Sequence, residues 1–89
     1  MLMVTESASA HLAKVLVNAN AAEEKVVRFV SEEDRLVPKL DTQRPGDMTF
    51  DHEGKTVLVL ETDIAATLTN RTLDVTDTNA GPRLYLRED

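Results

Sequence analysis

The stretch MTFDHEGKTVLVL, which runs from Met48 to Leu60, predicts a β-hairpin with one buried strand. Its first part alternates apolar and polar residues, a pattern typical of a strand with one buried face. Gly54 supplies a turn residue between the two strands. Thr56–Leu60 is the most continuous apolar strand pattern in the chain, so we expect this strand to lie in the centre of a sheet.

Upstream of the hairpin, the sequence predicts two further extended segments. Lys25–Ser31 is rich in β-branched and aromatic residues, which favours a strand. Glu32–Asp34 gathers three like charges, so we expect a turn or a solvated loop there. Leu36–Leu40 contains Pro38, which cannot donate to a neighbouring strand, so we expect this segment at a sheet edge or an irregularity. Residues 43–47 hold a Pro-Gly pair typical of a type II turn.

An amphipathic helix is expected near the N terminus, after a short strand at Met1–Val4. Thr5 is the predicted N-cap, and Asn18 and Asn20 mark the predicted end of the helix. The apolar residues between them recur at helical spacing and are Ala8, Leu12, Val15, Leu16 and Ala19.

Downstream of the hairpin, Thr62 is the predicted N-cap of a shorter helix, with Ile64 and Leu68 on one face. Strands are expected at Thr72–Thr76 and at Arg83–Arg87. The resulting order, β-α-β-β-β-β-α-β-β, predicts a single α+β domain over residues 1–89.

Composition excludes several classes of function. The chain is 42% hydrophobic and carries a net charge of −6, with its basic residues scattered among acids. It therefore offers no cationic surface for nucleic acid or for an anionic membrane. No N-terminal segment resembles a signal peptide and no apolar run is long enough to span a membrane, so we expect a cytoplasmic protein.

The residue types that carry most chemistry are missing. The sequence has no cysteine, so it has no thiolate to act as a nucleophile or as a ligand of a metal or cluster. It has no Gly-x-Ser-x-Gly motif, and its three glycines form no phosphate-binding loop. We expect no enzymatic activity, and we assign no catalytic, cofactor-binding or metal-ligating residue.

Two short groups contain residues of metal-ligand type. Glu32–Asp34 lacks the ligand spacing of a calcium loop, and a solvated loop is the favoured interpretation. In Asp51-His52-Glu53, the two acids share one face of a strand and His52 points to the other, so the three converge only if a bulge intervenes. His11 has no second histidine at helical spacing and is expected at the surface or at its boundary with the core.

Tyr85 lies between Leu84 and Leu86 in the last predicted strand, which gives this strand bulky residues on both faces. Such a strand either associates with another chain at its edge or is covered on both faces. We favour the second arrangement and expect the strand to be buried.

Several segments occur in an order that is familiar from one protein family. They are Val4–Ala8 with Leu12, Val27–Val30, Gly46-Asp47 with Phe50, Glu53-Gly54, Val57–Val59, Leu68, Leu73–Val75, and Gly81 with Leu84–Leu86. Together they resemble the HesB-like family of A-type iron–sulfur cluster carriers over nearly the whole chain. The resemblance implies a small, mostly β domain whose mixed sheets form a pseudo-barrel or sandwich, with one longer N-terminal helix and one short helix.

The differences from this family fall on its functional positions. Members carry one cysteine in a glycine-rich loop after the second strand and two more in a Cys-Gly-Cys tail. Here the loop holds Glu32–Asp34, and the sequence ends at Arg87–Asp89, roughly where that tail would begin. Carboxylates do not replace thiolates as cluster ligands. The resemblance therefore supports the fold and argues against cluster binding, and no site residue of the family has a counterpart here.

Three hypotheses follow from the sequence. The first is a cysteine-free HesB-like domain that acts as a protein-interaction module, with iron–sulfur assembly factors or their clients as partners and no cofactor of its own. The second is a carrier of iron or another hard cation that uses Asp51, Glu53, Glu32–Asp34 and His52. The third is a structural subunit that forms homo-oligomers through its terminal strand.

Overall fold

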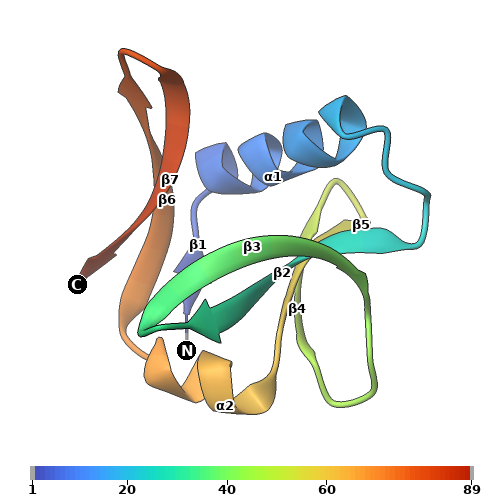
Figure 1. The fold of residues 1–89 in the computed structure, drawn as a ribbon, viewed down its shortest axis with the longest axis vertical. Coiled ribbons are helices and arrows are strands. Elements are labelled where there is room, and N and C mark those ends of the chain that lie inside the picture. Colours follow the sequence, from blue (N-terminus) through green and yellow to red (C-terminus); the bar gives the residue numbers. More distant parts are fainter. Residues whose placement is uncertain (1, 89) are drawn as a thin grey trace.

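Within residues 2–88, which the computed structural model describes, the chain forms two mixed sheets and two helices (Figure 1). Met1, which belongs to the predicted first strand, and Asp89, which follows the last predicted strand, lie outside the described residues. The elements are β1 (Met3–Val4), α1 (Glu6–Asn18), β2 (Lys25–Glu32), β3 (Arg35–Thr42), β4 (Met48–His52), β5 (Lys55–Leu60), α2 (Thr62–Thr67), β6 (Arg71–Thr78) and β7 (Gly81–Glu88). This order agrees with the sequence prediction and confirms a small α+β fold.

The two sheets do not close into a barrel in this part of the chain. One has the strand order β3-β2-β5-β4 and the other the order β1-β6-β7, and the two are not joined by hydrogen-bonded strands. Closure into a barrel requires a continuous ladder of hydrogen bonds around the axis. The pseudo-barrel alternative is therefore wrong, and two separate mixed sheets are observed.

The strand β5 is the centre of the four-stranded sheet, as the sequence predicts. It pairs in parallel with β2 and antiparallel with β4, and β3 completes the sheet beside β2. Residues 57–60 of β5 are all buried, at most 1% exposed. Pro38 lies in β3 at the edge of the sheet, where a residue without an N–H group is tolerated.

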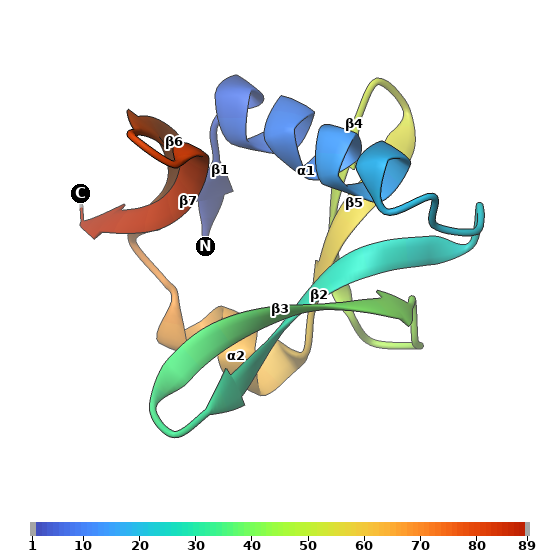
Figure 2. The ribbon, with the colours of Figure 1, turned by 45° about the horizontal axis from the view of Figure 1, so that its top comes forward.

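Helix α1 connects the two sheets. It contacts β2, β4 and β5 of the larger sheet and β6 of the smaller one (Figure 2). Its buried face carries Leu12 and Leu16, which are 1% and 4% exposed and join the common core with Leu58 and Leu73. The amphipathic pattern of this segment therefore supplies the layer between the sheets.

The first helix begins at the predicted cap. The Oγ1 atom of Thr5 accepts a hydrogen bond from the N–H of Ala8 at 3.1 Å, and it donates another to Asp74 Oδ1 at 2.9 Å. The cap predicted for the second helix is wrong. Thr62 is already helical and donates to the carbonyl of Gly46, and Glu61 occupies the cap position without a side-chain hydrogen bond to the helix.

The acidic triplet is divided between a strand and a turn. Glu32 is the last residue of β2 and pairs with Arg35, so the predicted loop contains only Glu33 and Asp34. Both have positive φ angles, 51° and 63°. Two such residues form the type I′ turn whose twist matches that of the flanking strands. The chain therefore reverses directly at the point where the sequence predicts a break.

The final strand is not covered on both faces. β7 is an edge strand, and Tyr85 is 40% exposed, whereas Leu84 and Leu86 pack against the core. Side chains on a strand alternate between faces, so the two leucines reach the interior while the tyrosine does not. The expectation of a buried final strand is wrong for Tyr85.

Candidate functional site

The turn between β2 and β3 carries only oxygen atoms as possible ligands. Glu33 and Asp34 form this turn, and both are exposed. The neighbouring Glu32 is engaged elsewhere, because its Oε2 lies 2.7 Å from Nζ of Lys39 in an ion pair. These residues therefore point into solvent or along the sheet and do not converge on a common point.

The Asp51-His52-Glu53 group is also dispersed. A register shift between Phe50 and Asp51 supplies the irregularity that convergence would require. Asp51 nevertheless accepts a hydrogen bond from Thr56 Oγ1 at 2.8 Å, and His52 Nδ1 lies 3.6 Å from Oε1 of Glu6. Among residues 2–88, no three His, Asp or Glu side chains come close enough to hold a metal ion. The structure does not assemble the hard-cation site of the second hypothesis.

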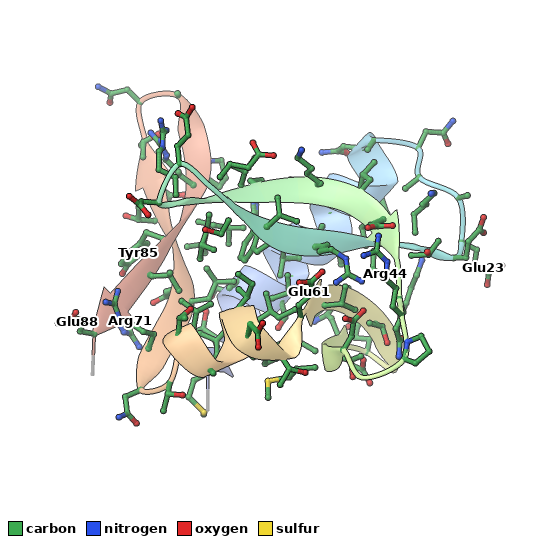
Figure 3. The ribbon with its side chains drawn as sticks, turned by 60° about the horizontal axis from the view of Figure 1, so that its bottom comes forward. Glu23, Arg44, Glu61, Arg71, Tyr85 and Glu88 are labelled. Atoms are coloured by element: carbon green, nitrogen blue, oxygen red, sulfur yellow. The ribbon has the colours of Figure 1, made fainter. Side chains whose placement is uncertain are left out.

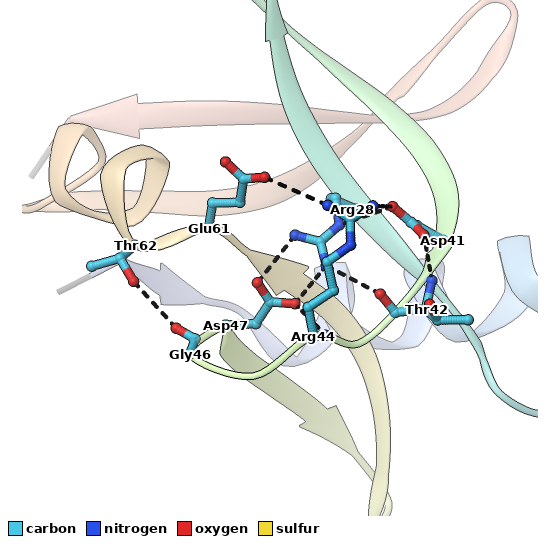
Figure 4. A network of polar contacts seen from close by, with 8 residues as sticks. All are labelled: Arg28, Asp41, Thr42, Arg44, Gly46, Asp47, Glu61 and Thr62. Carbon is cyan, nitrogen blue, oxygen red and sulfur yellow. Dashed lines mark hydrogen bonds and ion pairs between the residues drawn. The ribbon is translucent and has the colours of Figure 1, made fainter.

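A buried ionic cluster lies on the larger sheet (Figure 4). At its centre is Arg28, in the middle of β2, whose side chain is 2% exposed. Its Nη1 donates to Asp47 Oδ1 at 3.1 Å and its Nη2 donates to Asp47 Oδ2, and Nη2 also donates to the carbonyl of Thr42 at 3.1 Å. Its Nε lies 3.2 Å from Asp41 Oδ2 but donates no hydrogen bond within the described chain.

This cluster anchors the turn between β3 and β4. Asp47 Oδ2 accepts the N–H of Arg44 at 2.8 Å, and the N–H of Asp47 donates to the carbonyl of Arg44 at 3.2 Å. Gly46 has a φ of +86°, as the third residue of a type II turn requires. The predicted turn is confirmed, and the buried guanidinium ties it to the sheet.

The acids of the cluster are held in their charged forms. The hydrogen bonds from Arg28, and a weaker contribution from the N–H of Arg44, keep the pKa of Asp47 below its ordinary value against the opposing effect of burial. The pKa of Asp41 is lowered mainly by the N–H of Thr42, which donates to its Oδ1 at 2.7 Å. Within the described residues, the charge of the guanidinium is matched by Asp41 and Asp47, and only its Nε donates no hydrogen bond, so we interpret the cluster as structural.

The role of Arg28 was not predicted from the sequence, in which this residue is one of ten basic residues scattered among acids. Its position carried a signal, because it interrupts the apolar run Val26-Val27-Arg28-Phe29-Val30. An arginine inside a buried strand requires a partner for its charge. The identity of that partner was not visible, since Asp47 is 19 residues away in the sequence.

An apolar groove of about 520 Å³ lies between α1, the β2–β3 hairpin and the β6–β7 hairpin. Its floor consists of the buried side chains of Val27, Phe29 and Leu73, and Leu36 of β3 forms part of one wall. The opposite wall is formed by the consecutive residues 82–86 of β7. Its volume lies within the range of ligand-binding pockets.

Few polar groups border this groove. His11 of α1 is half-buried, and Arg83 and Tyr85 of β7 are exposed. Figure 3 shows Tyr85 on the β6–β7 hairpin that also carries Arg71 and Glu88. The groove therefore combines apolar walls with cationic and hydroxyl groups, and it is the candidate functional site of this chain.

Comparison with known proteins shows which solved structures have a similar fold. No protein-family model matches the sequence, and no curated protein matches it. Among solved structures, SufA of Escherichia coli, which is involved in the biosynthesis of iron–sulfur clusters, aligns with a TM-score of 0.71 over 98% of this chain and 84% of its own, at 17% identity. The chain has the HesB-like fold.

Two further structures support this conclusion. IscA with a [2Fe-2S] cluster aligns with a TM-score of 0.66 at 16% identity, over 99% of this chain and 85% of its own. A protein from Aquifex aeolicus aligns with a TM-score of 0.66 at 20% identity, over 99% of this chain and 91% of its own. The resemblance seen in the sequence is confirmed at the level of the HesB-like fold.

The residues present on this HesB-like scaffold do not fit an iron–sulfur cluster. Cluster irons are held by thiolates, and the sequence contains no cysteine. The carboxylates of Glu33 and Asp34, next to the second strand, are hard oxygen ligands of a different chemical class. No helix in the described part of the chain is long and apolar enough to cross a membrane.

Proposed function

We propose that this chain is a protein-interaction module with the HesB-like fold that takes part in iron–sulfur cluster biogenesis without holding a cluster through its own residues. The observation that carries the proposal is a scaffold similar to SufA over 98% of this chain, in a sequence without cysteine. The presence of this fold without thiolate ligands favours a role that depends on the surface of the protein. Iron–sulfur assembly factors or their clients are the proposed partners.

The apolar groove between the two hairpins is the surface that best suits such a role. It leaves apolar side chains of α1, β3 and β7 partly accessible at one place, and apolar clefts with a few polar groups at their border are typical binding sites. A partner that covers the groove would gain a favourable free energy of roughly 25 cal/mol for each Å² of apolar surface removed from water. The cytoplasmic location and the absence of enzymatic activity stay predictions from the sequence.

Reconstitution with iron and sulfide tests the first half of the proposal. The chain is incubated anaerobically with ferrous iron, sulfide and a thiol reductant, desalted, and examined by visible absorption spectroscopy, with IscA treated in the same way as a positive control. We expect IscA to keep its chromophore and this chain to elute colourless, because it supplies no thiolate ligand. A chromophore that stays with this chain after desalting would refute the proposal.

Partner identification tests the second half. The tagged chain is cross-linked in its native cells, and the captured proteins are identified by mass spectrometry in parallel with an Arg83→Glu variant. We expect cluster-assembly proteins or cluster-receiving clients to be captured by the unmodified chain and depleted with the variant, since Arg83 borders the groove. Capture of unrelated proteins alone, or equal capture by both chains, would count against this role.

A further inference from the structure

We propose that the groove receives an extended acidic peptide segment of a partner protein, which adds as a strand to the free edge of β7. Its aliphatic side chains would enter the groove, and one of its carboxylates would lie beside Arg83. This inference rests on the proposed function, because it names the kind of partner segment that the interaction module binds. Its failure would leave the absence of a cluster, tested above, unaffected.

The free edge of β7 provides the backbone partner. β7 is the last strand of its sheet and pairs with β6 on one side only, so alternate N–H and C=O groups along its other side are unpaired within the sheet. Its proline, Pro82, stands near the beginning of the strand, so the later residues whose N–H groups face away from β6 stay able to donate. β3, the other edge strand at the groove, has Pro38 in its middle, which makes it the poorer template.

The course of the groove favours an extended segment. Residues 82–86 of β7 all line it, although successive side chains of a strand point to opposite faces. A groove that touches both sets of side chains runs along the edge of the strand and not across one face. A peptide paired with that edge would therefore place every second side chain between β7 and the opposite wall at Leu36.

Charge determines the character of the segment. Arg71 and Arg87 of the same β6–β7 hairpin are paired with Glu88 at 3.0 Å and Asp74 at 2.7 Å. Arg83 is exposed and makes no ion pair within the described residues, and His11 borders the same groove. A carboxylate on the incoming segment would complement Arg83. The free edge would also accept β7 of a second copy of this chain, and the test below distinguishes that occupant from an acidic segment of a partner.

A set of labelled synthetic peptides tests the inference with the full chain. The first peptide alternates Leu with Thr and carries two Glu residues at one end; a second has Lys in place of Glu, and a third has Ser in place of Leu. Binding is measured by fluorescence anisotropy. We expect the acidic, Leu-containing peptide to bind, and we expect Arg83→Glu to weaken its binding about fivefold or more. Lys55→Glu, which makes the same charge change at the β4–β5 turn, should alter binding less than about twofold.

Hydrogen exchange distinguishes strand addition from other modes of binding. We expect the bound acidic peptide to slow amide exchange along residues 83–88, since backbone groups of β7 become paired. Binding without added protection in β7, or equal binding of the Lys peptide, would overturn the inference. Concentration-dependent dimerisation of the chain through β7 would also overturn the inference, because a second copy would then be the occupant. Myristate binding that displaces the peptide and depends equally on Arg83 would overturn it as well, because a lipid would then be the occupant.

Discussion

At the scale of single residues, the most consequential side chain is Arg28. It is 2% exposed, holds Asp47 through two hydrogen bonds, and connects β2 to the turn before β4. Replacing both partners of such a buried ion pair by apolar residues changes the stability of a protein little. Removing one partner lowers the stability strongly, because the other charge then stays buried without a counter-charge. The residue therefore holds the β3–β4 turn against the sheet.

Replacement of Arg28 by methionine should lower the free energy of unfolding by roughly 3–5 kcal/mol, because the carboxylate of Asp47 would stay buried without its partner. Urea unfolding monitored by circular dichroism measures the change. Arg35→Met on the neighbouring strand is the matched control, since Arg35 is exposed, and should change stability by less than about 0.5 kcal/mol. Adding Asp47→Asn to Arg28→Met should recover part of the loss. Equal effects of the two single changes would contradict the structural role of the cluster.

The stability of the protein should fall in acid, and Asp47 should account for part of the fall. Its pKa is lower in the folded state than in the unfolded state, so its contribution is complete above the unfolded value of about 3.9 and is lost as the pH falls through the folded pKa. Urea unfolding between about pH 6 and pH 2.5 measures this. We expect a shallower dependence in Asp47→Asn. Asp77→Asn, an exposed change on β6, should follow the unmodified protein, and identical curves for all three would rule out the contribution of Asp47.

At the scale of elements, the β2–β3 hairpin reverses the chain through a tight two-residue turn. Glu33 and Asp34 turn the chain with φ angles of 51° and 63°, a region that costs a non-glycine residue about 1–2 kcal/mol. The eight residues of β2 and the eight of β3 pair along their full length, which compensates for this cost. A tight turn presents its side chains outward, so the element is suited to connecting strands and not to enclosing a ligand.

The strain in this turn predicts a stabilising change. Asp34→Gly should raise the free energy of unfolding by roughly 0.5–1 kcal/mol, because glycine adopts a positive φ without steric cost. Asp34→Val is the matched control and should lower it by about 1–2 kcal/mol, since a β-branched residue is strongly disfavoured there. Thermal and urea unfolding measure both. If valine were tolerated as well as glycine, the left-handed conformation of Asp34 would be refuted.

At the scale of the whole molecule, the two sheets meet through α1 and leave the groove beside it open. The larger sheet has its central strand buried at residues 57–60, whereas β7 of the smaller sheet has one free edge and an exposed Tyr85. The molecule therefore joins a well-packed body to a hairpin with fewer buried side chains. One wall of the groove therefore belongs to the larger, well-packed sheet, and the other is the edge strand β7 of the smaller sheet.

Native-state hydrogen exchange should reveal this difference. We expect the amides of Val57–Leu60 to exchange most slowly, at rates set by global unfolding, and those of residues 82–88 in β7 to exchange faster through local opening. Two-dimensional NMR or mass spectrometry after proteolysis measures the rates. Equal protection of β5 and β7 would show that the hairpin and the larger sheet open as one unit, contrary to this expectation.

Much of the fold could be predicted from local patterns. The alternation at Met48–His52, the apolar run ending at Leu60 and the Thr5 cap each act over a few residues, and the order of elements follows from them. The Pro-Gly turn at residues 44–47 could also be predicted, because φ preferences belong to single residues. The absence of cysteine determined from the sequence alone that thiolate chemistry is excluded.

Only the tertiary structure decided which distant residues meet. The pairing of Arg28 with Asp47, the dispersal of Asp51 and His52, and the edge position of β7 depend on how the elements pack, which neither propensity nor periodicity encodes. The groove is also a property of packing, since its walls come from five elements. Local patterns specify which face of an element is apolar, whereas the contacts between elements determine which of those faces stay open to a partner.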